Sequence, residues 1–275
     1  MGSSLHTVFV TVCLWAGLSG VALAHESWLS LDSAKLDATR HVQKIKLSMT
    51  SGERFPIPQL PIKPDRMDQA HCRSGSMQSA LSPAGLSAKT LLLTAEVPDK
   101  EPSICWVQLK ARALNLDLAK VEQYLREIDA SDAVRLAWQQ SPEPKTWHES
   151  YTKNAKLHLL PPGVHSTVPD NLAPVGLALE LVVDERLFTG RKGDRFGVQA
   201  LRHGQPIQGL SISLHGAKTR KTVRQRTDAA GAAQFDVPAS GQWMLSATDL
   251  RSTNSQLGEW ESQFTTTAFE KAARH

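Results

Sequence analysis

The chain has 275 residues, of which 41% are hydrophobic and 21% are charged, a balance typical of a globular protein that buries a core. Its formal net charge at pH 7 is +4, and its isoelectric point is near 9.0. This mild basicity, without a basic cluster interleaved with aromatic residues, argues against nucleic acid as a partner.

The first 24 residues have the pattern of a secretory signal peptide. A short apolar run at 7–20 is followed by Ala22 and Ala24, the small residues that a signal peptidase requires. The run is shorter than the ~20 apolar residues that span a bilayer, and no later segment of the sequence is long enough. We therefore expect cleavage after Ala24, no membrane span in the mature chain and a periplasmic or secreted location. His25 would then be the first residue.

Residues 25–172 are predicted to form an antiparallel β domain that contains a small helical insertion. Its apolar stretches are short and lie at 42–49, 91–97 and 104–109. Within the first stretch, Ile45 and Leu47 alternate with polar residues, which is the period of two expected of a half-buried strand.

Two cysteines remain once the leader is removed, Cys72 and Cys105. In an oxidising compartment they form the single possible intramolecular pair. Closing a loop of this length would stabilise the fold by roughly 3–4 kcal/mol on the chain-entropy model. The alternative, a thiolate metal site, lacks the usual CxxC spacing. We therefore predict a Cys72–Cys105 disulfide.

The helical insertion is predicted at about 117–160. Its first helix carries apolar residues at spacings of three and four: Leu118, Val121, Leu125 and Ile128. Ser131 can cap a second helix that ends at Gln140. A third helix is predicted from Lys145 to the prolines at 161–162, with one face formed by Trp147, Tyr151, Ala155 and Leu159. We expect these helices to pack across the end of a sheet, with the aromatic residues in the core.

Residues 173–269 are predicted to form an immunoglobulin-like β-sandwich, so that the fold class of the whole chain is mainly β. Seven short strands are expected at regular spacing: 177–183, 195–201, 210–214, 222–226, 233–237, 242–247 and 262–269. Residues 204–209 and 227–231 carry turn signals between them. The last six residues, 270–275, are predicted to be a frayed tail.

The sequence lacks the familiar motifs of enzymes. It contains no phosphate-binding glycine loop, no GxSxG nucleophile elbow, no HExxH and no CxxCH. Its serine, histidine and acidic residues have no local spacing that marks a catalytic triad or an acid–base pair. We therefore expect a protein that is not an enzyme.

The remaining candidates for chemistry are histidines. A chain that begins at His25 carries an α-amine and an imidazole on one residue, and together they can chelate Ni(II), Co(II) or Cu(II) once both are deprotonated. Glu26 can supply a nearby oxygen ligand or orient the imidazole. His41 and His71 are candidates for a second histidine because they fall in the same predicted domain. The predicted metal residues are therefore His25, Glu26, His41 and His71.

The mature chain also carries several short motifs in a characteristic order: His25-Glu26-Ser27-Trp28-Leu29, Gly52-Glu53-Arg54-Phe55-Pro56, Tyr124–Glu127, Glu149–Lys156, 174–182, 204–209, 227–231 and Trp260-Glu261-Ser262. This ordered set resembles a family of secreted bacterial proteins of unknown function. Members of that family are found beside nickel and cobalt uptake systems and are described as their periplasmic component. Relatives often carry an aromatic residue at the position of Ser27 and a histidine shortly before the final Trp-Glu-Ser, where residues 249–258 of this chain contain none.

The resemblance implies a β-rich periplasmic protein of two domains that handles transition metals. The leading hypothesis is a non-catalytic accessory protein that binds or presents a metal ion to an inner-membrane importer. One alternative is a structural or adhesive sandwich module that binds a protein or carbohydrate through exposed aromatic residues, with Trp243 and Trp260 as candidates. Another is a copper oxidative enzyme, which requires a second histidine beside His25 and an open axial position.

Overall fold

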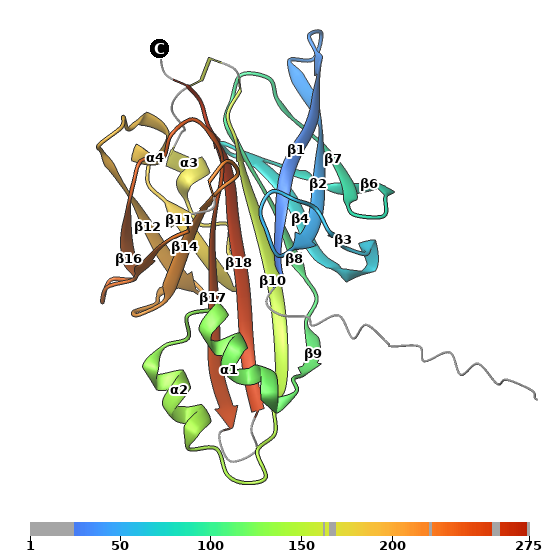
Figure 1. The fold of residues 1–275 in the computed structure, drawn as a ribbon. Helices are drawn as coiled ribbons and strands as arrows, with labels where there is room; N and C mark the ends of the chain where they lie inside the picture. Colours follow the sequence, from blue (N-terminus) through green and yellow to red (C-terminus); the bar gives the residue numbers. More distant parts are fainter. Residues whose placement is uncertain (1–24, 162, 165–168, 220–221, 255–258, 274–275) are drawn as a thin grey trace, which may run out of the picture.

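The computed structural model describes residues 25–161, 163–164, 169–219, 222–254 and 259–273. These residues form a mainly β structure of three sheets with small helices at its ends (Figure 1). Among the described helices, none is long and apolar enough to cross a membrane.

A nine-stranded sheet, which we call the central sheet, runs through the middle of the molecule. Its strand order is β15-β14-β17-β18-β10-β8-β4-β5, and β9 pairs with the end of β10. The strands are β4 (Met67–Ser74), β5 (Met77–Ala80), β8 (Ser103–Leu109), β9 (Arg112–Asn115), β10 (His148–Leu159), β14 (Ser211–Gly216), β15 (Val223–Arg226), β17 (Gly241–Asn254) and β18 (Glu259–Lys271). Strands β10 and β18 pair in parallel, and the other pairings of the sheet are antiparallel.

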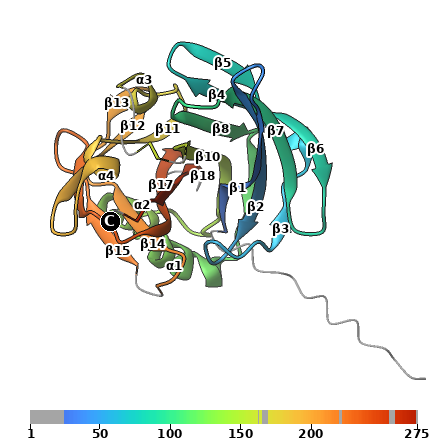
Figure 2. The same cartoon turned by 90° about the horizontal axis from the view of Figure 1, so that it is seen from above.

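Two smaller antiparallel sheets flank the central sheet, as the view from above shows (Figure 2). The N-terminal sheet contains β1 (Glu26–Asp37), β2 (Val42–Gly52), β3 (Leu60–Pro61), β6 (Ser82–Leu86) and β7 (Leu91–Pro98). The C-terminal sheet contains β11 (Leu179–Val183), β12 (Arg195–Arg202), β13 (Gln205–Pro206) and β16 (Ala232–Asp236).

The two smaller sheets pack on opposite faces of the central sheet, because successive side chains of a strand point to opposite faces. On β17, Met244 belongs to the apolar core beneath the N-terminal sheet, whereas Leu245 belongs to the core beneath the C-terminal sheet. Strand β10 likewise places Ala155 and Leu157 in the first core. The central sheet therefore joins strands from both sides of residue 173 into one continuous hydrogen-bonded layer.

A buried ion pair links the central sheet to the C-terminal sheet. Lys156 of β10 donates from Nζ to Glu180 Oε1 of β11 at 2.8 Å, and both side chains are 2% exposed. Burial lowers the pKa of Lys156, which the charge of Glu180 opposes. For Glu180, burial opposes ionisation, but the charge of Lys156, its hydrogen bond and backbone N–H groups together lower the pKa. The attraction between the two groups therefore opposes the cost of burying them.

Helices α1 (Leu118–Glu127) and α2 (Asp132–Gln139) begin where the sequence predicts them and cover one end of the long strands β17 and β18 (Figure 1). Asp117 caps α1 by accepting from the Ala119 N–H at 3.1 Å, and Ser131 caps α2 by accepting from the Val134 N–H. Helices α1 and α2 enclose an aromatic core in which Trp147 stacks on Trp260, with 4.6 Å between the ring centroids. Short helices complete the fold: η1 (Pro64–Arg66), α3 (Pro169–Leu172) and α4 (Arg186–Thr189).

The predicted third helix is wrong: residues 148–159 form strand β10. The spacing of four between Trp147, Tyr151, Ala155 and Leu159 imitates a helical face. The strand lies in the interior of the central sheet between β8 and β18, and residues 154–158 are buried whichever way they point. Strand β10 therefore lacks the regular alternation of polar and apolar residues by which a half-buried strand is predicted from sequence.

The strands predicted in the C-terminal half are present as β11, β12, β14, β15, β16, β17 and β18, and together they form two facing sheets. Strand β18 continues through Lys271, past the expected start of the tail, because the buried Lys271 ammonium donates to the carbonyls of Phe188 and Gly190 at 2.8 and 3.0 Å. Residues 274–275 of that tail lie outside the described residues, as does the predicted leader.

The Cys72–Cys105 disulfide is confirmed. The two cysteines lie directly opposite one another on the neighbouring strands β4 and β8. The bond therefore ties two adjacent strands of the central sheet across a sequence separation of 33 residues.

Candidate functional site

His25 lies immediately before β1, at the end of the N-terminal sheet. The β1–β2 register pairs Glu26 with Gly52, which brings His25 beside Glu53. His25 Nε2 lies 3.3 Å from Glu53 Oε1, and the His25 side chain is 19% exposed. A carboxylate at this position favours the tautomer in which Nε2 carries the proton and Nδ1 keeps its lone pair.

His25 borders a cavity of about 310 Å³ between the N-terminal sheet, η1 and the strands β9 and β10. Four cationic side chains line this cavity, which we call the basic pocket: Lys63, Arg66, Arg112 and Lys153. The remaining walls are apolar, aromatic or uncharged, and no Asp or Glu is among the described residues that line it. The basic pocket is therefore electropositive.

Lys153 is the most enclosed of these cations. Its ammonium donates to the backbone carbonyl of His25 and lies 5.8 Å from the centre of the Tyr151 ring and 5.2 Å from that of Phe264. Burial lowers the pKa of Lys153 from 10.5 to about 8, partly offset by the negative charge of Glu26. The side chain is still mainly charged at neutral pH, so it holds the start of β1 against β10 as a cation.

Arg66 presents a buried donor to the same region. Its Nη2 donates to the Lys110 carbonyl at 3.1 Å, but its Nε–H is buried and has no acceptor among the described residues. A buried donor without an acceptor is costly, which favours a site where a ligand or water supplies one. Arg112 and Lys63 are exposed at the rim.

Beneath the basic pocket, Glu149 accepts three hydrogen bonds. Its donors are the Tyr124 hydroxyl and the Trp147 indole N–H, both at 2.9 Å, and the Ser262 hydroxyl. Burial raises the pKa of Glu149, and these donors oppose that rise. Because Tyr124 also lines the pocket, this network fixes its floor.

Glu26 points away from His25 although it is the next residue. Its carboxylate lies 3.6 Å from His215 Nε2 on β14 of the central sheet. The alternation of side chains along β1 explains the separation, since neighbouring residues of a strand face opposite sides. Glu26 therefore contributes charge near Lys153 and does not pair with the imidazole of His25.

Neither of the other two predicted histidines lines the basic pocket beside His25. His41 lies in the turn at the opposite end of the β1–β2 hairpin, beyond 12 residues of β1, or roughly 40 Å at about 3.3 Å per residue. Its Nδ1 lies 3.7 Å from Asp99. His71 lies on the face of β4 opposite Cys72 and packs on Trp106 at 5.6 Å. In the part of the chain that the structure describes, no three His, Cys, Asp or Glu residues gather in a group able to hold a metal ion.

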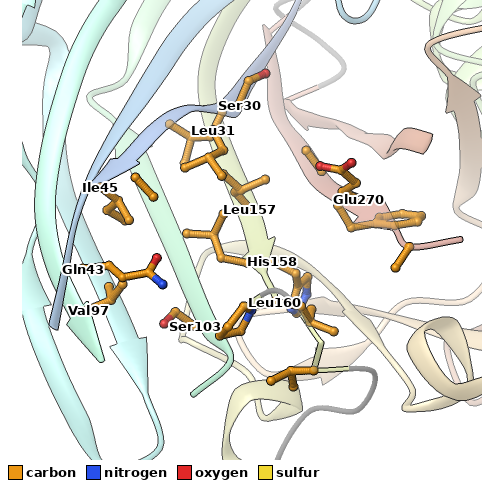
Figure 3. Close-up of a pocket in the computed structure, with 18 of the residues that line it drawn as sticks. Ser30, Leu31, Gln43, Ile45, Val97, Ser103, Leu157, His158, Leu160 and Glu270 are labelled. Carbon is orange, nitrogen blue, oxygen red and sulfur yellow. The ribbon is translucent and has the colours of Figure 1, made fainter. Parts of the chain in front are cut away.

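A larger cavity, of about 490 Å³, opens at the other end of the molecule (Figure 3). Residues of the N-terminal sheet such as Ile45 and Val97 face Leu157 of β10 across it, with Glu270 on the side of β18. Its buried polar residues are Ser103, His158 and Lys271, and the Nε2 of His158 has no hydrogen-bond partner among the described residues. Burial, with the nearby charges of Lys156 and Arg73, lowers the pKa of His158 to about 3. The cavity is thus largely apolar, and none of the predicted metal residues lines it.

Five residues of the basic pocket and its rim were not predicted from the sequence: Glu53, Lys63, Arg66, Arg112 and Lys153. For Glu53 a partial signal exists, because a hairpin that turns at residues 38–41 sets residue 25 opposite residue 54. The β-bulge between Leu31 and Ser33 then shifts the partner by one residue, to Glu53. For the four cations the sequence offers no comparable signal, since they come from the residue before η1, from η1, from β9 and from the strand that was predicted as a helix.

Fold and site together define a mainly β protein with a histidine held beside a small electropositive pocket. The chain belongs to the family described as "Domain of unknown function (DUF4198)", whose model matches residues 22–249. No curated protein matches the chain.

Solved structures with detectable similarity include native α2-macroglobulin from Escherichia coli spanning domains MG0-NIE-MG1, at 11% identity and a TM-score of 0.21. That comparison covers 88% of this chain and 96% of the other. The Bacillus anthracis TIE protein is 8% identical with a TM-score of 0.18, over 89% of this chain and 58% of the other. TM-scores this low carry no inference about fold or function.

Proposed function

We propose that the mature protein is a non-catalytic periplasmic accessory protein that binds Ni(II), Co(II) or Cu(II) at His25 and presents the ion to an inner-membrane importer. The observation that carries this proposal is the contact of His25 Nε2 with the Glu53 carboxylate at 3.3 Å. Histidines that bind metals typically donate their other ring N–H to a carboxylate, which fixes the tautomer and the ring orientation.

Cleavage after Ala24 would release the α-amine of His25. The amine and Nδ1 would then form a chelate on one residue, while Glu53 accepts from Nε2–H and raises the basicity of the ring. Both nitrogen donors suit Ni(II), Co(II) and Cu(II). The metal ion is the cargo in this proposal, and the protein residues position its ligands.

A chelate from a single residue leaves several coordination positions open. Such a site binds and releases its ion more readily than a closed site of four protein ligands. This property suits a protein that passes an ion to an importer, because the importer can bind the ion at its open coordination positions before this protein releases it.

The alternative of an adhesive module has less support. A carbohydrate-binding surface would present exposed aromatic rings, yet Trp260 is 2% exposed and Trp243 is half-buried, with its indole N–H donating to the Ala239 carbonyl at 2.8 Å. The described Trp, Tyr and Phe residues are all buried or half-buried. A copper oxidative enzyme would need a second histidine, and His25 is the one histidine among the described residues that line the basic pocket.

The proposal is tested by titrating Ni(II) into the mature protein and into two histidine variants. We expect a Kd tighter than roughly 1 μM, equivalent to about −8 kcal/mol, and a loss of at least about 100-fold in H25Q. H41Q is the matched control, since it removes an exposed histidine at the far end of the same hairpin and should bind as the parent does. Equal binding by H25Q and the parent would reject the site.

A further inference from the structure

The basic pocket poses a problem for a metal ion bound at His25 alone. The ammonium of Lys153 already contacts the backbone carbonyl of His25, and three further cations line the same cavity. A divalent cation chelated by the amine and Nδ1 of His25 would sit beside these positive charges. No carboxylate among the described residues lines the cavity; Glu53 contacts Nε2 of His25 but is not part of that lining.

The pocket also has room and donors for a second molecule. Its volume of about 310 Å³ corresponds to roughly ten water molecules at ~30 Å³ each, which suits a small organic acid. The buried Nε–H of Arg66 lacks an acceptor among the described residues, and the cationic side chains of Arg112 and Lys63 are exposed at the rim. Arginine side chains bind carboxylates through paired N–H donors.

We propose that the basic pocket binds a small di- or tricarboxylate, and that the metal ion is held at His25 as the chelate of this acid. Some carboxylate oxygens of the acid would occupy the coordination positions of the metal ion that His25 leaves open. The remaining oxygens of the acid would accept hydrogen bonds from Arg66, Arg112 and Lys63. Such an anion would neutralise the cations of the pocket and would also supply the ligands that the metal ion lacks. This inference rests on the proposed function of His25 for its metal and on the basic pocket for its anion.

The two parts are separated by titrating Ni(II) alone, citrate alone and Ni(II) in the presence of citrate into the mature protein, at matched free Ni(II) and ionic strength. We expect citrate to tighten the apparent affinity for Ni(II) at least ten-fold. In R66Q/R112Q the tightening should disappear, while Ni(II) alone should bind at least as tightly as in the parent because repulsion is reduced. The single variant R112Q changes an exposed side chain and should lose part of the effect of citrate on the Ni(II) affinity. It serves as the control for a folding defect in the double variant.

The control is K100Q/K192Q, which removes two exposed cations far from the pocket and should keep the full effect of citrate. The inference is overturned if citrate leaves the Ni(II) affinity unchanged, or if R66Q/R112Q still shows the tightening. Binding of Ni(II) alone without an effect of citrate would reject the anion and leave the proposed function standing. Binding of citrate alone that R66Q/R112Q abolishes, with no binding of Ni(II), would reject the metal at His25 and keep the anion pocket.

Discussion

Removing either member of the Lys156–Glu180 pair is expected to destabilise the protein, and the two removals should differ. Glu180 accepts from the backbone N–H groups of Val175, Gly176 and Leu177 at 2.8–3.2 Å in addition to Lys156. Lys156 has Glu180 as its sole hydrogen-bond acceptor among the described residues. The carboxylate would therefore remain partly satisfied without the lysine, whereas the ammonium would lose its partner without the glutamate.

The magnitudes follow from burial. E180A leaves an uncompensated buried charge, which costs about 3–5 kcal/mol, and it removes the acceptor of the buried Leu177 N–H, which costs about 1 kcal/mol more. K156M leaves a carboxylate that still accepts from three N–H groups, so we expect about 2–3 kcal/mol. The double variant K156M/E180L should cost less than the sum of the single variants by about 2 kcal/mol or more, since no isolated charge remains.

The assay is urea unfolding of the oxidised mature protein at pH 7, followed by tryptophan fluorescence, with free energies compared at constant m-value. We expect neither an equal cost for K156M and E180A nor additivity of the two substitutions. Either outcome would mean that the pair does not act as a desolvated unit between the central and C-terminal sheets.

Further predictions concern single residues. His158 has a folded pKa of about 3 against 6.5 when unfolded, so the unfolded chain binds a proton between these values that the folded protein does not. Stability should therefore fall by up to about 1.4 kcal/mol per pH unit as the pH drops from 6.5 towards 3. H158L should show a shallower fall over pH 6 to 4 in urea unfolding, and equal slopes would count against a neutral buried imidazole. Reduction of the Cys72–Cys105 bond should lower the unfolding free energy by roughly 3–4 kcal/mol, and an unchanged urea midpoint after reduction would contradict this. E53Q should weaken Ni(II) binding by about 10–100-fold, with E101Q as an exposed control, and an unaltered Kd would remove Glu53 from the site.

The sequence was informative where local patterns decide the structure. Helix α1 follows from its apolar spacing and the cap at Asp117, and the C-terminal strands follow from regular turns such as 204–209. The disulfide follows from there being two cysteines outside the predicted leader. The helix and the strands depend on residues close in sequence, and the disulfide depends on there being two cysteines that can form a single pair.

The features that were missed depend on contacts between distant segments. Strand β10 is buried on both faces, and the polar Lys156 within it is stabilised by Glu180, a residue that no local pattern connects to it. The basic pocket likewise draws its cations from separate elements, and His25 meets Glu53 through strand pairing. Motifs that are far apart in the sequence also meet beneath the basic pocket, where Trp260 stacks on Trp147 and Ser262 donates to Glu149.

The proposed metal site depends on a free amino terminus at His25. Calorimetric titration of Ni(II), Co(II) and Cu(II) should compare the mature protein that begins at His25 with a sample that carries one glycine ahead of it. We expect binding tighter than roughly 1 μM in the first sample and its loss in the second, because the added residue converts the amine to an amide. Equal binding by both samples, or binding by neither, would contradict this expectation.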